Sequence, residues 1–509
     1  METKTAAIEM RNITKRFGPV LANDKVWLNI YRGEILALLG ENGSGKTTLM
    51  NMLSGIYFPD EGEIKIDGKE VVIRSPKDAF DNGIGMIHQH FKLVDVLTAA
   101  ENIVLGLPGK LDLKAASAKI REICDKYGFS VDPAQKIYDM SVSQKQTVEI
   151  VKVLYRGADI LILDEPTAVL TPQETDKLFA VLRNMRNDGK AIVIITHKMH
   201  EVEALSDRVA ILRHGQFIGD MLTAHTNAQE MTNMMVGHAV SLNIERPDPV
   251  DPTPRIEVKG LTVRSVDGIV KLDDVSFTAN SGEILGIAGI SGCGQKELLE
   301  SIAGLQTVES GSISYIEDDG SREELIGKDP LSIAELGVSL SFVPEDRLGM
   351  GLVGNMNLAD NMMLRSFRRG KSIFTDRRSP RALAESVVQE LSVSTPSVDT
   401  PVRRLSGGNV QKVLVGREIA SAPTVLLTAY AVRGLDIHSS YTIYDLINRQ
   451  KKAGVAVIFV GEDLDVLLEL CDRILVLCGG KVSGIVSGRG AEKREVGMMM
   501  TKLGGQSHE

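Results

Sequence analysis

Residues 40–48 constrain the local fold more strictly than any other stretch of the chain. They read Gly-Glu-Asn-Gly-Ser-Gly-Lys-Thr-Thr and match the phosphate-loop pattern G-x-x-x-x-G-K-[ST] at every fixed position. A mainly apolar run at residues 34–39 precedes the loop and a helix-compatible run follows it at residues 48–53. The sequence therefore predicts strand, loop and helix in that order. The alternative is a glycine-rich turn that carries Lys-Thr by coincidence.

This loop supplies the first candidate ligands. Glycines allow successive N–H groups to turn inward around an anion, and the start of the following helix adds partial positive charge. We expect Lys46 to neutralise the β- and γ-phosphates of a nucleotide, and the Thr47 hydroxyl to occupy one position on Mg²⁺. The predicted nucleotide-binding residues here are Gly40, Glu41, Asn42, Gly43, Ser44, Gly45, Lys46, Thr47 and Thr48.

The chain repeats one plan twice. Residues 33–36, Gly-Glu-Ile-Leu, recur at residues 282–285, an offset of 249, and Ser141 corresponds to Ser406 at an offset of 265. The second copy therefore holds 16 more residues between its phosphate-loop position and Ser406. An acidic, Pro-rich stretch lies between the copies. It predicts a stiff, extended linker at residues 244–255, between domains at residues 1–243 and 256–509.

Two short apolar runs in the first copy end in polar residues. Residues 160–163 lead into Asp164-Glu165, and residues 191–195 lead into Thr196-His197. Such unalternating runs are typical of buried parallel strands, whose carboxyl ends carry the chemistry of α/β proteins. A helical segment is expected at residues 173–187. A charged insert with a helical pattern is expected at residues 99–140.

The polar residues at these strand ends have expected roles. Asp164 is placed to hold Mg²⁺ through its water shell, and Glu165 to polarise the attacking water. His197 is a candidate sensor of the γ-phosphate, and Gln89, after another short strand, a candidate for reaching Mg²⁺ or the water. Phe17 either stacks on an adenine ring or belongs to the core. Each of these residues alone would more often be structural, so their weight comes from occurring together.

Composition limits the class of protein. A chain of 509 residues, 43% hydrophobic and 25% charged, is long enough for two or more globular domains. Its net charge of −9 argues against a general binder of nucleic acid. Four cysteines without metal spacing are read as reduced thiols. Neither a signal peptide nor an apolar run of about 18 residues is seen. We expect a cytosolic protein that reaches a membrane only through a partner.

These pieces resemble one family. Leu405-Ser406-Gly407-Gly408-Asn409 resembles the signature loop of ABC-type ATPases, and residues 140–144 look like a weaker version of it. The resemblance covers essentially the whole chain. It implies an α/β fold with two P-loop ATPase domains in tandem, each with a RecA-like core and a helical subdomain. It also implies that ATP and Mg²⁺ are held between the phosphate loop of one domain and Ser406, Gly407 and Gly408 of the other.

The second copy departs from the family pattern where chemistry would occur. Gln295 stands in place of the loop lysine, and Ala429-Tyr430 in place of the carboxylate pair. The first copy departs instead in its signature, with Val142-Ser143, and at Thr171, where the second copy has Asp436. The resemblance therefore predicts one competent composite ATP site. The remaining second-copy changes are Lys296 for the loop Ser/Thr, Glu345 for Gln89 and Glu462 for His197.

The tandem arrangement is similar to ATPase subunits of bacterial importers for simple sugars and nucleosides. Residues 88–94 and 97–106 look more like the nucleoside branch. The resemblance implies a peripheral protein on the cytoplasmic face of the membrane, two permease subunits and a receptor lipoprotein. Three alternatives remain: a sugar importer, a nucleotide sensor without turnover, and a soluble tandem ATPase acting on ribosomes or DNA. The short connector, the negative charge and the lack of a cysteine cluster argue against a nucleic-acid partner.

Overall fold

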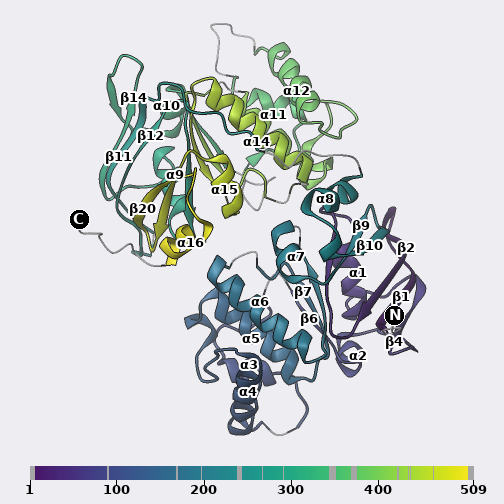
Figure 1. Ribbon diagram of the computed structural model, residues 1–509. Helices are drawn as coiled ribbons and strands as arrows, with labels where there is room; N and C mark the ends of the chain where they lie inside the picture. The colour runs from purple at the N-terminus through teal and green to yellow at the C-terminus, as the bar shows by residue number, and fades with distance from the viewer. Residues whose placement is uncertain are drawn as a thin grey trace. The chain divides into compact units, whose positions relative to one another are not determined.

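The computed structural model describes most of the chain and divides it into two compact units, residues 1–241 and 242–509, each described by itself. In each unit helices pack against sheets, which confirms the predicted α/β fold (Figure 1). The described residues are 6–88, 91–109, 111–167, 170–196, 198–237, 244–265, 267–290, 292–342, 351–367, 375–420, 423–433, 435, 437–461 and 463–501.

The first unit is built on a six-stranded sheet in the order β10-β9-β3-β8-β7-β6, parallel except for β10. Leu36 and Leu38 of β3 pack into a core with β1, β2 and α1, whereas Ile35 packs into a second core with α5 and α6. Because both faces are covered, the central strands β3, β7 and β8 are buried along their whole length, and the two predicted from their apolar runs are confirmed. The bounds are β3 Ile35–Leu39, β6 Ile84–Ile87, β7 Ile160–Asp164, β8 Ala191–Ile195, β9 Arg208–Arg213 and β10 Gln216–Leu222.

A smaller antiparallel sheet, in the order β2-β1-β4-β5, covers one of these cores. In β2, buried Val26, Leu28 and Ile30 alternate with exposed residues, as expected of a sheet with one face on the core. Its strands are β1 Ala6–Phe17, β2 Val20–Tyr31, β4 Glu61–Ile66 and β5 Lys69–Val71.

Capping boxes begin three helices of the first unit, at Thr98, Ser141 and Thr171. The predicted helices at residues 99–140 and 173–187 are confirmed by α3, α4 and α6. Helices α3, α4 and α5 enclose a core of their own and form the helical part of the unit. The bounds are α1 Lys46–Leu53, α2 Pro76–Asp81, α3 Ala99–Val104, α4 Leu113–Tyr127, α5 Val142–Tyr155, α6 Pro172–Asn187, α7 Met199–Leu205 and α8 Ala228–Val236.

The second unit repeats this plan, with sheets in the orders β16-β17-β18-β13-β19-β20 and β12-β11-β14-β15. Its strands are β11 Pro254–Arg264, β12 Val270–Asn280, β13 Ile284–Gly289, β14 Ser310–Ile316, β15 Arg322–Glu324, β16 Val338–Phe342, β17 Val425–Ala429, β18 Ala456–Val460, β19 Arg473–Cys478 and β20 Lys481–Ser487. Its helices are α9 Gln295–Ile302, α10 Pro330–Glu335, α11 Leu358–Met363, α12 Arg378–Glu390, α13 Gly407–Ile419, α14 Ile437–Lys452, α15 Leu464–Leu470 and α16 Lys493–Thr501.

The repeat extends to ion pairs formed by a buried glutamate. Arg208 pairs with Glu34 at 2.7 Å in the first unit, and Arg473 pairs with Glu283 at 2.6 Å in the second. Each arginine also donates to a backbone carbonyl of the neighbouring antiparallel sheet. The pairs are related by the two sequence offsets, 249 for the glutamates and 265 for the arginines. The offsets therefore identify structurally equivalent residues in the two copies.

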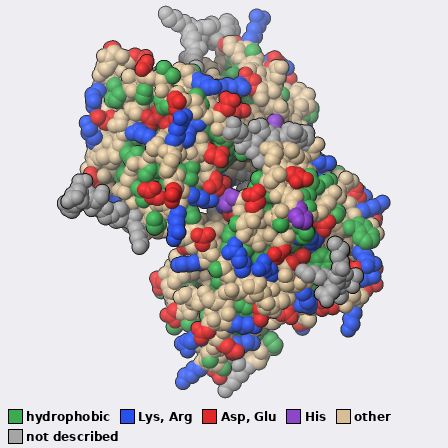
Figure 2. All heavy atoms as spheres, in the orientation of Figure 1, with side chains coloured by type: hydrophobic (Ala, Val, Ile, Leu, Met, Phe, Trp, Pro, Cys, Tyr) green, Lys and Arg blue, Asp and Glu red, His purple; other side chains and the backbone are tan. Residues whose placement is uncertain are grey.

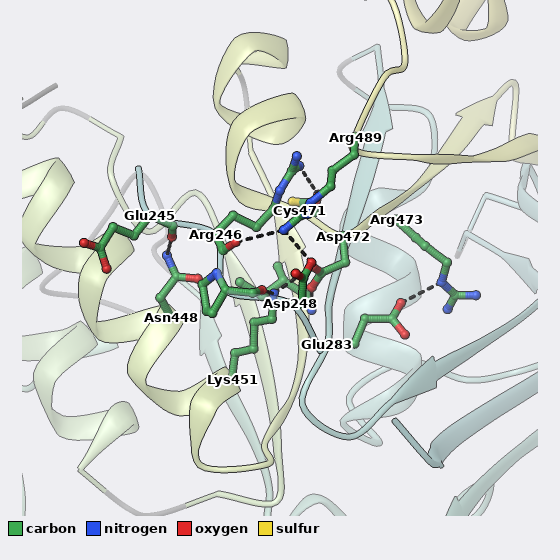
Figure 3. Close-up of polar contacts among 12 residues, drawn as sticks. Glu245, Arg246, Asp248, Glu283, Asn448, Lys451, Cys471, Asp472, Arg473 and Arg489 are labelled. Atoms are coloured by element: carbon green, nitrogen blue, oxygen red, sulfur yellow. Dashed lines mark hydrogen bonds and ion pairs between the residues drawn. The ribbon is translucent and has the colours of Figure 1, made fainter. Parts of the chain in front are cut away.

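The Pro-rich segment before β11 is fastened to the second unit, as Figure 3 shows. Arg246 donates to the carbonyl oxygen of Cys471 at 2.7 Å, and Asn448 donates to the carbonyl oxygen of Glu245. Lys451 donates to the carbonyl oxygen of Pro247. Residues 244–248 are thus tied to α14 and to the end of α15.

The surface in view in Figure 2 carries Asp and Glu side chains interspersed with Lys and Arg. Among the described helices, none combines the length and apolarity needed to cross a bilayer. The four cysteines are unpaired, and two of them, Cys124 and Cys471, are buried.

Candidate functional site

The phosphate loop joins β3 to α1 and depends on glycine at two close approaches. Gly40 and Gly45 have φ angles of 155° and 96°. A Cβ atom at Gly40 would lie 2.2 Å from the carbonyl oxygen of Leu212, and one at Gly45 would lie 2.4 Å from that of Ala22. No other residue type fits there without moving backbone. The loop can therefore wind tightly at the start of α1.

The side chain of Lys46 lies inside this loop. Its ammonium donates to the carbonyl oxygens of Gly40 at 2.7 Å and Glu41 at 2.9 Å, and the residue is only 8% exposed. Burial lowers the pKa of Lys46, while Glu165, Asp164 and Glu41 act in the opposite direction. A cation poorly hydrated in this way is suited to exchange its carbonyl contacts for phosphate oxygens.

The other loop residues form the rim. Ser44 is buried, and its N–H donates to the carbonyl oxygen of Glu41 at 3.1 Å. Asn42, Gly43 and Thr47 are exposed, and Thr48 is half-buried in the first turn of α1. Part of the loop is therefore open to solvent.

Two oxygen ligands lie together at the end of β7. The hydroxyl of Thr47 donates to Oδ2 of Asp164 at 3.3 Å, so the two predicted metal ligands are neighbours. Burial raises the pKa of Asp164 to about 6, with a further contribution from the charge of Glu165. A carboxylate and a hydroxyl are ligands that Mg²⁺ accepts alongside phosphate oxygens and water. These residues therefore fit the metal, which would relieve the buried charge.

Glu165 follows Asp164 in an uncommon backbone conformation. Its φ angle is 47°, in the left-handed region, and its N–H donates to the carbonyl oxygen of Ile195 at 2.9 Å. Non-glycine residues rarely adopt this region, and such residues cluster at functional sites. The bond to Ile195 joins the ends of β7 and β8 at this point.

Of the remaining predicted residues of the first unit, only Phe17 is described. Gln89 and His197 lie outside the described residues. Phe17 ends β1, is 41% exposed and is therefore not a core residue. Its ring meets Tyr57 edge to face, with centroids 5.1 Å apart and an interplanar angle of 71°. Tyr57 was not predicted, and the adjacent aromatic residues Tyr57 and Phe58 shortly after α1 are the sequence signal that could have found it.

The equivalent positions of the second unit are arranged differently. Gln295 is buried, and its amide donates to the carbonyl oxygen of Ile290 at 3.3 Å, so a neutral group fills the position of Lys46. Lys296 instead pairs with Glu300 one turn along α9, at 3.6 Å. Tyr430 keeps the left-handed backbone of Glu165, with φ 56°. The backbone is conserved between the copies, whereas the chemical groups are not.

The two signature helices also begin differently. At the start of α5, Ser141 accepts from the backbone of Gln144, whose side chain accepts in turn from the backbone of Ser141. At the start of α13, no described side chain caps the backbone, and the Ser406 hydroxyl accepts from the Asn409 amide at 2.8 Å. The first helix start is therefore closed by its own side chains, and the second is left open.

The chain matches a known protein family and relatives with assigned roles. The ABC transporter family model matches residues 23–168 and 272–428. The chain is 42% identical to the nucleoside import ATP-binding protein NupA of Lactococcus lactis, over 99% of both chains. It is 39% identical to the glucose import ATP-binding protein TsgD13 of Haloferax volcanii, over 98% of this chain and 96% of the relative. It is 40% identical to the guanosine import ATP-binding protein NupO of Bacillus subtilis, over 97% of both.

Proposed function

The chain belongs to the ABC transporter family, as an ATPase, and from this premise we propose that it is the energy-coupling subunit of an import system for nucleosides. The observation that carries the proposal is the group formed by Lys46, Thr47, Asp164 and Glu165 in the first unit. Similarity to a nucleoside and a guanosine import protein supports the substrate class. Import of simple sugars is the second candidate, favoured by the glucose import relative.

ATP binding in this proposal begins with the phosphate loop. The backbone N–H groups at the start of α1 and the ammonium of Lys46 bind the β- and γ-phosphates. Phe17, which is 41% exposed, is assigned to the adenine ring. Thr47, Asp164 and Gln89 would hold Mg²⁺, which would neutralise phosphate charge when bound.

Hydrolysis is assigned to the residues that follow Asp164. Glu165 accepts a hydrogen bond from the attacking water and orients it toward the γ-phosphate. His197 contacts the γ-phosphate. Lys46 stabilises the charge that builds on the phosphate oxygens as the bond to the β-phosphate breaks. The position of Glu165 directly after Asp164, whose carboxylate lies 3.3 Å from the Thr47 hydroxyl, supports this role.

The second unit contributes a different part. We assign Ser406, Gly407 and Gly408 to the γ-phosphate of the ATP bound by the first unit, because the start of α13 has open N–H groups and that of α5 does not. The second unit's own phosphate loop is given no hydrolytic role, since Gln295 and Ala429 carry neither the cation nor the carboxylate. One site of two then hydrolyses ATP.

The partners follow from the import role. The chain is assigned to the cytoplasmic face of the membrane, where it binds two permease subunits that receive the substrate from an extracytoplasmic receptor. Each cycle of ATP binding and hydrolysis closes and reopens the two halves and drives the permease.

The experiment uses the chain assembled with its permease in proteoliposomes. Replacing Glu165 by Gln is expected to retain ATP binding, to lower turnover at least 100-fold and to stop uptake of a labelled nucleoside. Tyr430→Phe, at the equivalent position of the second unit, is the matched control and should leave turnover within about twofold. Uptake of ribose or glucose but not nucleosides would assign the sugar class instead. Undiminished turnover in Glu165→Gln would refute the assignment of the site.

A further inference from the structure

A buried carboxylate lies beside the site without belonging to it. Glu201, in the first turn of α7, is only 4% exposed. It accepts hydrogen bonds from the hydroxyls of Thr167 and Thr196, the latter at 3.2 Å. The ammonium of Lys198 lies 3.3 Å from the same carboxylate, and the His200 ring lies 4.0 Å away. Its charge is therefore buried but well satisfied.

The three bonded residues connect two neighbouring strand ends. Thr167 is two residues beyond Glu165, after β7, and Thr196 directly follows β8 and precedes His197 in the sequence. Lys198 adds a contact at 3.5 Å to the carbonyl oxygen of Thr167. The carboxylate of Glu201 thus cross-links the two segments that carry the proposed water-orienting and phosphate-sensing residues.

The second unit lacks this cross-link entirely. The positions equivalent to Thr167, Thr196 and Glu201 are Val432, Gly461 and Val466, at the same offset of 265. Both valines pack against the core of that unit. All three polar groups are therefore replaced together, by apolar residues or glycine, in the copy that has also lost its carboxylate pair.

Neighbouring contacts that serve the fold are kept in both copies. The amide of Gln146 donates to the carbonyl oxygen of Pro166, and that of Gln411 donates to the equivalent carbonyl of Ala431. The backbone bond from Glu165 to the end of β8 also has its equivalent, from Tyr430 to Val460 at 3.0 Å. The fold of this region therefore forms without the cross-link, and a purely structural role does not account for it.

We propose that Glu201, with Thr167 and Thr196, is a positioning group for ATP hydrolysis in the first unit. Hydrogen bonds to a buried charge are strong and directional, so the carboxylate restricts the two strand ends to one arrangement. Small displacements of a catalytic group cost large factors in rate, and a supporting shell of this kind prevents them. The effect falls on turnover rather than on binding, because the phosphate loop holds the nucleotide independently.

The decisive variant copies the second unit into the first, as Thr167→Val, Thr196→Gly and Glu201→Val together. It is expected to fold, to keep the KM for ATP within about twofold and to lose about 100-fold in kcat. Because this variant could fail to fold, Glu201→Gln and Thr167→Val are measured as well, each with an expected loss of about tenfold in kcat. Thr167→Ser keeps the hydroxyl and should restore wild-type turnover. Glu203→Gln, on the exposed face of α7, is the matched control: it alters only a contact with the backbone of Ala228 and should leave kcat unchanged.

Turnover is measured with the full chain and its permease, and binding with a fluorescent ATP analogue. Wild-type kcat in both single variants would overturn the proposal. A loss of binding and thermal stability in parallel with kcat would also overturn it, because it would show a structural role. The proposal rests on hydrolysis in the first unit, which Glu165→Gln tests separately. If Glu165→Gln abolishes turnover and the Glu201 and Thr167 variants do not, only the positioning role fails.

Discussion

The two units share their sheets and buried structural contacts but differ in the side chains at the phosphate-loop end of the sheet. Asn102 and Asn361 each close the loop before a helix with the same hydrogen bonds, to Val94 and Val353 respectively. The ion pair between Arg208 and Glu34 also has its copy in the second unit. By contrast, the cation, the carboxylates and the polar cross-link of the first unit are missing from the second.

This difference separates two kinds of polar group. Groups found in both copies satisfy buried donors and acceptors, which any version of this fold has to do. Where the second copy replaces a buried polar group by an apolar residue and keeps the fold, as Val466 replaces Glu201, the group is not needed for that purpose, and we attribute it to chemistry. The second unit therefore serves as a reference for the first, and substitutions at equivalent positions of the two units test this comparison.

The largest expected effect concerns an ion pair that both units contain but that is buried only in the second. Lys451 pairs with Asp472 at 2.7 Å, with side-chain exposures of 1% and 9%, beneath residues 245–248 (Figure 3). The equivalent Arg186 and Asp207 pair at 2.8 Å with exposures of 28% and 38%. Lys451→Ala leaves a buried carboxylate unpaired and should lower the free energy of unfolding by about 4 kcal/mol.

Arg186→Ala is the matched control for this prediction. Its pair is half-exposed, so the expected loss is below about 1 kcal/mol. Both are measured by calorimetry and urea unfolding of the full chain. Equal losses in the two variants would mean that residues 244–248 do not protect the second pair from water.

The next largest effect concerns the free energy of burying the Asp164 carboxylate, which only the first unit contains. The pKa of Asp164 is raised to about 6, mainly by burial, whereas its equivalent in the second unit is Ala429. The folded chain therefore holds this proton more tightly than the unfolded chain. The contribution of protonated Asp164 to the free energy of unfolding is fully present below about pH 4 and is lost as the pH rises through about 6. A shift of this size corresponds to about 3 kcal/mol.

Asp164→Asn removes this cost and keeps an oxygen for Thr47. Without nucleotide and Mg²⁺, the variant should unfold at a higher temperature than the wild type at pH 8, and the two should converge near pH 4. Calorimetry across this pH range measures the difference. Asp188→Asn is the control, because hydrogen bonds from Lys126 and Tyr127 lower the pKa of that exposed carboxyl, and it should show no gain at pH 8. A wild type more stable than Asp164→Asn at pH 8 would contradict the prediction.

Much of this comparison was accessible from sequence. The phosphate loop, the strand ends at Asp164 and Thr196 and the helical insert follow from short-range patterns, and the two offsets align the copies. Local patterns of this kind are set by nearest neighbours and by burial on both faces of a sheet. The offsets then identify Gln295 and Ala429 as changed positions from the sequence alone.

Long-range contacts were not accessible. The prolines indicate an extended segment before β11, but its attachment depends on Asn448 and Lys451, about 200 residues away and unremarkable in sequence. Glu201 likewise looks like an ordinary glutamate in the first turn of a helix. Only its burial between two strand ends shows that it has a specific task.

The smallest expected effects distinguish the two signature helices: a substitution at the start of α5 should change stability, and one at the start of α13 should change ATP turnover. Ser141→Ala removes a capping box and should lower stability by about 1 kcal/mol while leaving ATP turnover unchanged. Ser406→Ala removes a hydroxyl that caps no backbone group in the described structure, so stability should hold. Turnover should fall about tenfold, since a phosphate contact worth about 1.4 kcal/mol is lost. Unfolding and ATPase assays on the same preparations measure both. Loss of turnover in Ser141→Ala, or normal turnover in Ser406→Ala, would reverse the assignment of the open helix to the working site.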